Sequence, residues 1–259
     1  MKLISLNIWG GREFNALLSF LTSHAESTDI FCFQETFSFP KPLVSRGARL
    51  NIFQEFEKIL PLHQSFFFPT QDKIDEQGAT TIPSQYGQSL FVKKSLRVEK
   101  TDFVFAYRGR NSMKGDDFGT LGCGFAYAQL NIKKNPLTVV NVHGICEPGN
   151  KLDTPERLIQ SQKIKDFLDG VTGAKIFCGD FNLMPETESI KMLEKNMKNL
   201  IREFNIPETR GEISHRRFPK DPQHFADYAF VSPEIKIVSF QVPNVSISDH
   251  LPLILEFSL

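Results

Sequence analysis

The chain alternates between short apolar runs typical of β-strands and longer stretches whose apolar residues recur at helical spacing. Strands are predicted at residues 2–7, 29–35, 88–94, 97–107, 121–132, 137–144, 174–179, 226–231, 235–241 and 252–258. Helices are predicted over residues 12–24, 50–60 and 153–170 and near 186–196. Two groups of strands with intervening helices favour two sheets packed face to face, with the helices outside.

The pattern of apolar and polar residues gives no sign of a boundary between domains. The 259 residues contain no repeat, low-complexity tract or long linker, so we predict a single domain over residues 1–259. Two long polar segments, residues 108–119 and 208–224, are predicted loops. Long ordered loops in compact domains are often functional.

Composition narrows the class of protein. Apolar residues make up 41% of the chain and Phe contributes 25 residues, which we interpret mainly as core. The formal net charge is zero, so the whole molecule does not attract nucleic acid by charge alone. Four scattered cysteines predict reduced thiols in a cytoplasmic protein. No apolar run approaches the ~20 residues of a membrane span, so we predict no membrane insertion, and no obligate protein partner is evident.

The stretch 175–186, KIFCGDFNLMPE, places polar side chains directly after an apolar strand. If the chain stays extended, Asp180 and Asn182 point to the same side and Phe181 points toward the core. The sequence therefore predicts one spot that both polar side chains face.

Similar polar positions recur where other strands end. They are Asn7, Glu35, His143, Asp227 within its strand, and Asp249 with His250. Alone, each is better explained as a turn former, a helix cap or a structural histidine. Together, the oxygen ligands suit Mg²⁺ or Mn²⁺, and histidine can carry a proton to or from a phosphate oxygen. This set fits metal-dependent hydrolysis of a phosphodiester.

Six segments carry a family resemblance, and they occur in order: LNIWGGR, FQET, NVHG, GDFN, FADYAF and SDHLPL. The chain resembles the endonuclease/exonuclease/phosphatase superfamily, the metal-dependent phosphoesterases related to deoxyribonuclease I. The resemblance spans residues 3 to 257. It implies a four-layer α/β sandwich, with two mostly antiparallel sheets between outer helices.

The resemblance also implies roles. Glu35 matches the principal metal ligand, Asn7 the asparagine that supports the metal site, and Asp249 a further carboxylate that contacts metal or water. Asp180 matches the residue that orients or deprotonates the attacking water. Asn182 matches the amide that contacts the scissile phosphate.

Two histidines complete the expected machinery. His250 matches the histidine that stabilises the transition state or donates a proton, and Asp227 would hold its imidazole in the right tautomer. His143 stands where abasic-site endonucleases commonly have tyrosine, which argues against that activity. The implied cofactor is Mg²⁺ or Mn²⁺.

The substrate is predicted less directly, because specificity resides in the loops. Basic residues with interleaved aromatics, including Arg110, Arg216 and Arg217 as the candidate substrate rim, suit a nucleic-acid strand. A solvated loop of mixed charge is the equally weighted explanation. We predict a DNA endonuclease, an exonuclease or a DNA-end phosphodiesterase of the tyrosyl-DNA type.

Two alternatives remain open. One is a phosphatase or phosphodiesterase of inositol phosphates or lipid headgroups, such as a sphingomyelinase. The other is a binding module that keeps the fold without activity.

Overall fold

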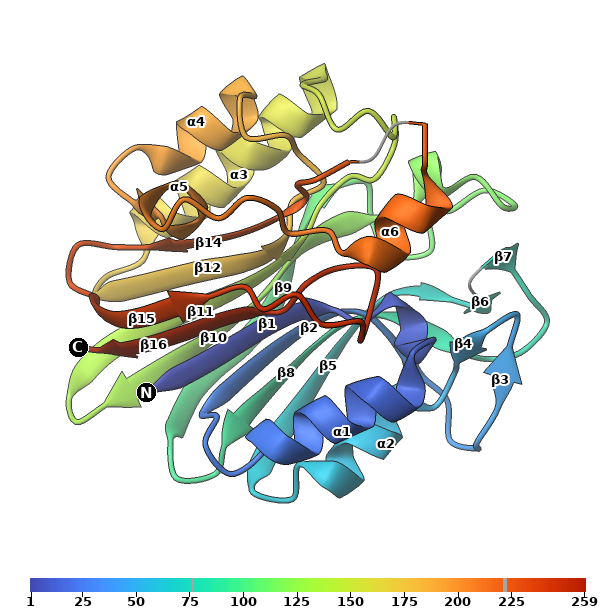
Figure 1. Ribbon diagram of the computed structural model, residues 1–259, viewed down its shortest axis with the longest axis horizontal. Helices are drawn as coiled ribbons and strands as arrows, with labels where there is room; N and C mark the ends of the chain where they lie inside the picture. Colours follow the sequence, from blue (N-terminus) through green and yellow to red (C-terminus); the bar gives the residue numbers. More distant parts are fainter. Residues whose placement is uncertain (76, 221–222) are drawn as a thin grey trace.

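Two six-stranded sheets pack face to face, with helices on both outer faces (Figure 1). This computed structural model describes residues 1–75, 77–220 and 223–259. The first sheet has the strand order β15-β16-β1-β2-β8-β5 and the second the order β13-β14-β12-β11-β10-β9. Two pairs are parallel, β1 with β2 and β11 with β12, and the other pairs within the two sheets are antiparallel. The predicted four-layer sandwich is confirmed.

The elements have the following bounds. The first sheet contains β1 (Lys2–Asn7), β2 (Ile30–Ser38), β5 (His63–Asp72), β8 (Gln85–Lys93), β15 (Lys236–Gln241) and β16 (Leu253–Ser258). The second contains β9 (Arg97–Tyr107), β10 (Cys123–Ile132), β11 (Asn135–His143), β12 (Ala174–Asp180), β13 (Lys198–Asn199) and β14 (Asp227–Val231). Two short hairpins pair β3 (Val44–Ser45) with β4 (Ala48–Arg49), and β6 (Ile74–Asp75) with β7 (Gly78–Ala79).

Helices are divided between the two outer faces. The helical elements are α1 (Phe14–His24), α2 (Ile52–Ile59), α3 (Pro155–Gly170), α4 (Glu188–Glu194), α5 (Leu200–Glu203), α6 (Glu212–Arg217) and the 3-10 turns Trp9–Gly11 and Phe118–Thr120. The pair α1 and α2 covers the first sheet, whereas α3, α4 and α5 lie on the second (Figure 1). The described part of the chain has no helix with the length and apolar character needed to cross a membrane.

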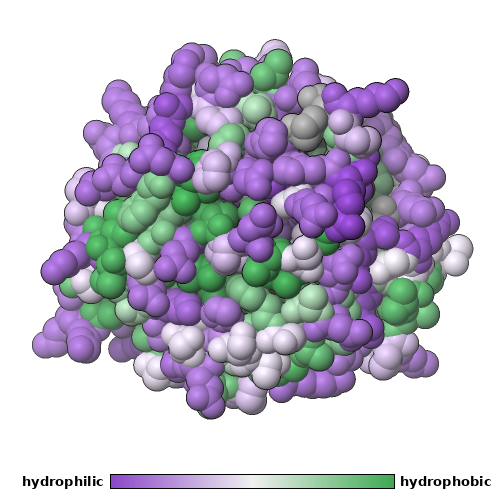
Figure 2. Space-filling model, in the orientation of Figure 1, coloured by the Kyte–Doolittle hydropathy of each residue, from purple (hydrophilic) through white to green (hydrophobic). Residues whose placement is uncertain are grey.

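Alternation along the strands of the first sheet separates two apolar cores. Leu3 and Cys32 point inward and join the larger core between the sheets. Their neighbours Ile4, Phe31 and Phe33 point outward and pack with α1 and α2. Polar side chains cover most of the surface in this view (Figure 2). Apolar side chains gather between the two helical layers, where the strands lie.

A buried polar ladder joins the sheets next to residues of the predicted site. Gln34 Nε2 donates to Asn141 Oδ1 over 2.5 Å, and Asn141 Nδ2 donates to the carbonyls of Phe33 and Ser89 over 3.0 and 3.2 Å. Gln34 and Asn141 are both fully buried. Because a buried polar group without a partner is costly, this ladder fixes how the two sheets align.

The structure differs from the sequence prediction in several places, including a strand, a strand end and a loop. The edge strand β5, with its run of three Phe and Pro69, was not predicted. Strand β2 continues past Glu35 to Ser38 through a bulge, so Glu35 is not at a strand end. The predicted loop 208–224 contains helix α6, and its residues 221 and 222 lie outside the described residues.

Candidate active site

A cavity of ≈ 460 Å³ opens where residues from both sheets meet. Its lining includes Glu35 from the first sheet, Asp180 from the second, and His250 from the segment that precedes β16. Glu35 and His250, distant in sequence, therefore share one cleft. Six of the eight predicted catalytic and metal-binding residues line it: Glu35, His143, Asp180, Asn182, Asp249 and His250.

Strand register brings one row of these residues together. His143 lies directly opposite Asp180 in the parallel pair β11–β12, and Asp180 lies opposite Asp227 in the antiparallel pair β12–β14. Directly paired residues point to the same face of a sheet. His143 Nε2 lies 3.9 Å from Asp180 Oδ2, whereas Asp227 reaches the site through His250.

Glu35 enters the cavity because the backbone bends there. The register of β2 against β8 shifts between Phe33 and Thr36, and Glu35 has a φ of 56°. A left-handed conformation is costly for Glu and persists only where the surrounding structure enforces it. The bulge re-aims this carboxylate, so that its Oε1 lies 3.8 Å from His143 Nε2.

Asn7 links the two carboxylates. Its Nδ2 donates to Glu35 Oε1 and to Asp180 Oδ2, each over 3.0 Å, while its Oδ1 accepts from the backbone N–H of Trp9 over 3.0 Å. The Trp9 contact fixes which way the amide points. In this arrangement Asn7 orients the carboxylates, and its own oxygen is already engaged.

His250 is held from both sides. Its Nδ1 lies 2.7 Å from Asp227 Oδ2, and its Nε2 lies 2.7 Å from Arg210 Nη1 and 3.7 Å from Asp180 Oδ2. The Arg210 contact fits a neutral ring with its proton on Nδ1, because a guanidinium only donates.

Opposing charges act on the protonation of His250. Burial and Arg210 lower the pKa of His250, but the carboxylates of Asp227, Asp180 and Asp249 outweigh them and raise it overall. Burial raises the pKa of Asp227 despite its bond to the imidazole. The protonated ring therefore needs Arg210 Nη1 to turn away, which a bound phosphate group would favour by attracting the guanidinium.

Asp249 is paired with arginines. Its Oδ2 accepts from Arg210 Nη2 over 3.0 Å and from Arg217 Nη1 over 2.8 Å. Arg210 is itself 6% exposed, so this is a buried ion pair. In the sequence, Arg210 is one of several cations in the polar segment 208–224. The structure puts it in the wall of the cavity, against both Asp249 and His250.

Asn182 reaches the cavity by a turn, not along an extended chain. Strand β12 ends at Asp180, and Asn182 has a φ of 54°, which Asn tolerates better than most residues. Its backbone N–H donates to Asp180 Oδ1 over 2.9 Å. The predicted extended geometry is wrong at this point, although Phe181 is fully buried in the core as expected.

Lys151 is a cation of the site that sequence reasoning missed. Its Nζ donates to Asn182 Oδ1, and the residue is 4% exposed. Burial lowers the pKa of Lys151, although the carboxylate of Asp180 opposes the shift. A lone Lys in the polar segment 147–153 gives no sequence signal, because its burial depends on how that segment folds back.

The segment that carries Lys151 is anchored from behind by Arg157 of α3. This fully buried guanidinium donates to the carbonyls of Ile145, Cys146, Pro148 and Leu152, at distances from 2.7 to 3.3 Å. Four carbonyls around one cation replace the water that the charge loses on burial. Arg157 thereby positions one wall of the cavity.

Asp180 is ionised at neutral pH. Burial raises its pKa, but His250, Lys151, His143 and Arg210 together outweigh burial and hold the pKa of Asp180 at about 2. The carboxylate is therefore available as a hydrogen-bond acceptor or as a ligand at any physiological pH.

The three candidate rim arginines have different positions. Arg217 lines the cavity, and its guanidinium carbon lies 4.4 Å from the centre of the Trp9 ring. Arg110 pairs with Asp72 over 2.8 Å and Arg216 with Glu212 over 3.7 Å. Neither Arg110 nor Arg216 is among the described residues of the lining.

The donor set fits a divalent cation. Donor atoms of Glu35, His143 and Asp180 lie within 4.8 Å of one another. Among the described lining residues five carry carboxylates, namely Glu35, Asp75, Glu147, Asp180 and Asp249, against three basic side chains, Lys151, Arg210 and Arg217. A phosphate ester entering this excess of negative charge requires additional positive charge.

Comparison with known proteins identifies the class. The sequence model of the Endonuclease/Exonuclease/phosphatase family matches residues 4–250, and this chain belongs to that family. Its members are hydrolases that act on phosphoester bonds and typically use a divalent metal. The comparison with curated proteins gives no match.

Solved structures share the fold at low sequence identity. An endonuclease/exonuclease/phosphatase from Bacteroides vulgatus superposes with a TM-score of 0.73 at 19% identity, covering 100% of this chain and 98% of that one. A mannosyl-6-phosphatase of Bacteroides thetaiotaomicron gives 0.70 at 15% identity, with 100% of both chains covered. The human Nocturnin catalytic domain with bound sulfate gives 0.68 at 19%, covering 100% of this chain and 93% of that one.

Proposed function

We propose that residues 1–259 form one catalytic unit that hydrolyses a phosphodiester with the help of Mg²⁺ or Mn²⁺. The observation that carries this proposal is that Glu35, Asp180 and His250 line one cavity, with Asp227 bonded to His250. It joins candidate metal ligands to a histidine that is held by a carboxylate. A structural ion-pair network would not need the strained backbone at Glu35.

The metal would be held by Glu35 and Asp180, with Asn7 orienting both carboxylates. When bound, it supplies positive charge at the phosphate and lowers the pKa of a nearby water. The donors are mainly oxygen atoms, which favour Mg²⁺ or Mn²⁺ over softer ions.

The chain's own residues then divide the remaining work. The ionised Asp180 accepts a hydrogen bond from the attacking water and orients it. Asn182, whose carbonyl oxygen is bound by Lys151 and whose Nδ2 donates to the Gly144 carbonyl over 3.4 Å, presents the second hydrogen of Nδ2 to a phosphate oxygen. Protonated His250 donates to the oxygen that gains negative charge, and Asp227 keeps its ring in position.

The mouth of the cavity supports a nucleic-acid end as the substrate. Trp9 and Phe218 both line the cavity, and the guanidinium carbon of Arg217 lies 4.4 Å from the centre of the Trp9 ring and 5.3 Å from that of the Phe218 ring. Aromatic rings stack with bases, and an arginine beside them contacts a phosphate. The proposed first-choice substrate is therefore a terminal nucleotide of DNA, in the manner of an exonuclease or a DNA-end phosphodiesterase.

A small phosphate ester is the alternative substrate, and one observation favours it. Arg110 and Arg216, which would extend a basic track beyond the cavity, are paired with Asp72 and Glu212. A cavity of ≈ 460 Å³ is also within the range of small-molecule sites. Inositol phosphates, lipid headgroups and sugar phosphates belong to this class.

A substrate panel with purified protein and Mg²⁺ tests the proposal. It contains single- and double-stranded DNA, abasic DNA, a 5′-tyrosyl oligonucleotide, RNA, inositol phosphates, a mannose phosphate ester and sphingomyelin. The matched variants are His250→Ala, which removes the imidazole, and Asp169→Asn, which changes an exposed carboxylate on α3.

Turnover of a DNA end by wild type and Asp169→Asn, but not by His250→Ala, supports the first choice. Turnover of small esters alone moves the assignment to the alternative. No turnover of any compound would contradict enzymatic function and leave the binding module.

A further inference from the structure

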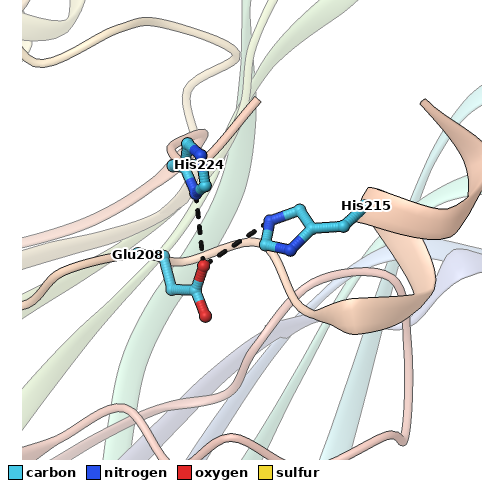
Figure 3. Close-up of side chains that lie close together, drawn as sticks. All are labelled: Glu208, His215 and His224. Carbon is cyan, nitrogen blue, oxygen red and sulfur yellow. Dashed lines mark hydrogen bonds and ion pairs between the residues drawn. The ribbon is translucent and has the colours of Figure 1, made fainter. Parts of the chain in front are cut away.

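A second group of metal-ligating side chains lies outside the cavity lining. Glu208 precedes the segment that delivers Arg210, His215 lies on α6, and His224 precedes β14. Both imidazoles point at the Glu208 carboxylate (Figure 3). The chain has six histidines, so two of them meeting one carboxylate on three separate segments is a specific arrangement.

The spacing of the donor atoms matches a tetrahedral metal site. Glu208 Oε2 lies 3.2 Å from His224 Nδ1 and 3.5 Å from His215 Nε2, and the three donors lie within 4.8 Å of one another. Zinc bonds of about 2.0–2.1 Å place neighbouring tetrahedral ligands about 3.3 Å apart. Closing the group around a cation therefore needs only small side-chain movements.

One nitrogen in this cluster has no hydrogen bond of its own. His215 Nε2 is buried and has no hydrogen-bond partner among the described residues, although Glu208 is near. The Glu208 oxygen that it faces already lies within hydrogen-bond distance of His224 Nδ1. A buried nitrogen without a hydrogen bond needs an explanation. Because His215 Nε2 faces a carboxylate and a second imidazole, a cation bound between the three groups would satisfy it.

The rings themselves are close. Their centroids are 4.9 Å apart at an interplanar angle of 63°. Protonating both imidazoles would set two positive charges side by side against one carboxylate. A divalent cation removes that conflict, because both rings then bind it in their neutral form.

We propose that Glu208, His215 and His224 bind a zinc-class divalent cation. Two imidazoles and one carboxylate suit Zn²⁺ better than Mg²⁺, which prefers oxygen ligands. The exposed side of His224 leaves a fourth position for water. This site is separate from Glu35 and Asp180, and it does not depend on the proposed function.

The position of the cluster indicates that the cation would have a structural role. The backbone N–H groups of Thr209 and Arg210 both donate to the carbonyl of His224, over 2.7 and 3.1 Å. At its end, α6 carries Arg217, which contacts Asp249 and Trp9. A metal that joins α6 to residues 208 and 224 would fix Arg217 and Phe218 at the mouth of the cavity.

Zinc binding tests the proposal directly. Chelator-treated protein is dialysed against micromolar Zn²⁺ in millimolar Mg²⁺, and bound zinc is measured by elemental analysis. All proteins carry Glu35→Gln, which weakens the group of Glu35, His143 and Asp180, so that zinc lost when Glu208 or His224 is changed reports the second group. Glu208→Gln and His224→Ala are then added separately, and His24→Ala, at a half-buried histidine bonded within α1, is the matched control.

We expect one zinc per chain in Glu35→Gln and in the His24→Ala control. Adding Glu208→Gln or His224→Ala should weaken binding at least tenfold. Zinc should also raise the thermal unfolding midpoint of Glu35→Gln, and not that of the variants lacking a ligand. His224 is half exposed, so His224→Ala should fold normally.

Two results would overturn the proposal. One is less than one zinc per chain in Glu35→Gln at these concentrations. The other is equal zinc content with and without Glu208 and His224. Neither result depends on turnover, so the metal cluster can fail while the catalytic proposal stands.

Discussion

Asp227 Oδ2 lies 2.7 Å from Nδ1 of His250, whose side chain lines the cavity. The bond fixes the tautomer and direction of the imidazole, so that Nε2 faces Asp180. The backbone N–H of Asp227 donates to Thr209 Oγ1, which anchors the aspartate in turn. His250 is therefore oriented by a side chain that itself has little freedom.

Replacing this partner should lower turnover without unfolding the protein. In Asp227→Asn, an amide of the same shape loses the charge that stabilises the imidazolium, and we expect kcat to fall about 10²- to 10⁴-fold. The measurement is kcat on the substrate found in the panel, beside the circular dichroism spectrum. Asp169→Asn should keep wild-type kcat, and an Asp227→Asn variant within threefold of wild type would contradict the role.

Removing the reacting groups should be more severe. Asp180→Asn and His250→Ala should each lower kcat by several orders of magnitude, because one orients the water and the other stabilises developing charge. The unfolding midpoint of each variant checks that the fold persists. Full activity in either variant would remove that residue from the mechanism.

Metal dependence should centre on Glu35. EDTA should abolish activity and Mg²⁺ or Mn²⁺ should restore it. In Glu35→Gln, the loss of one carboxylate charge should raise the Mg²⁺ concentration for half-maximal activity at least tenfold. Glu57→Gln, at an outer-layer glutamate bonded to Ser65, is the matched control. Activity that survives exhaustive chelation contradicts the metal assignment.

Lys151 should lower the stability of the folded protein while supporting catalysis. Burial lowers its pKa from the usual 10.5, so the charged form is disfavoured in the folded protein. Lys151→Met should therefore raise the free energy of unfolding at pH 7 by about 1 kcal/mol while lowering kcat/KM at least tenfold. The native state binds fewer protons just below pH 10.5, so wild-type stability should rise there and the difference should shrink.

Urea unfolding of both proteins at pH 7 and pH 10 measures this effect. Lys175→Met, at a lysine outside the active-site cavity, controls for the loss of a charge alone. A destabilised Lys151→Met would mean that the contacts with Asn182 and Asp180 outweigh the cost of burial.

The polar ladder between the sheets should support both stability and activity. Asn141→Ala leaves Gln34 and two carbonyls without their partner, and we expect a loss of about 2–4 kcal/mol in the free energy of unfolding. Because Gln34 precedes Glu35, kcat should fall as well. Asn135→Ala, at an exposed position of the same strand, should cost less than about 0.5 kcal/mol. Equal unfolding midpoints for the two variants would contradict the ladder's role.

The sequence predicted those parts of the fold that local pattern controls. Helix 153–170 was found because Thr154, Pro155 and the apolar spacing agree, and Thr154 does cap it by accepting from the N–H of Arg157. Strand β5 was not predicted because three consecutive Phe and a Pro show no alternation of apolar and polar residues. Pro69 is tolerated there because β5 lies at the edge of its sheet.

The site was predictable where a side chain follows a strand. His143 and Asp180 are aligned by strand pairing alone. Glu35 depends on a bulge, Asn182 on a turn with positive φ, and Lys151 on a segment held by Arg157. Those features come from tertiary packing, so no local pattern could place the last three.

The bulge in β2 sets the carboxylate of Glu35 from one sheet against Asp180 of the other, with the Asn7 amide between them. Neither sheet contains the proposed reaction centre by itself. We therefore expect turnover to depend on how the two sheets are aligned: heating or a core substitution that shifts one sheet by about 1 Å should lower the rate about 10²-fold before spectroscopy detects unfolding.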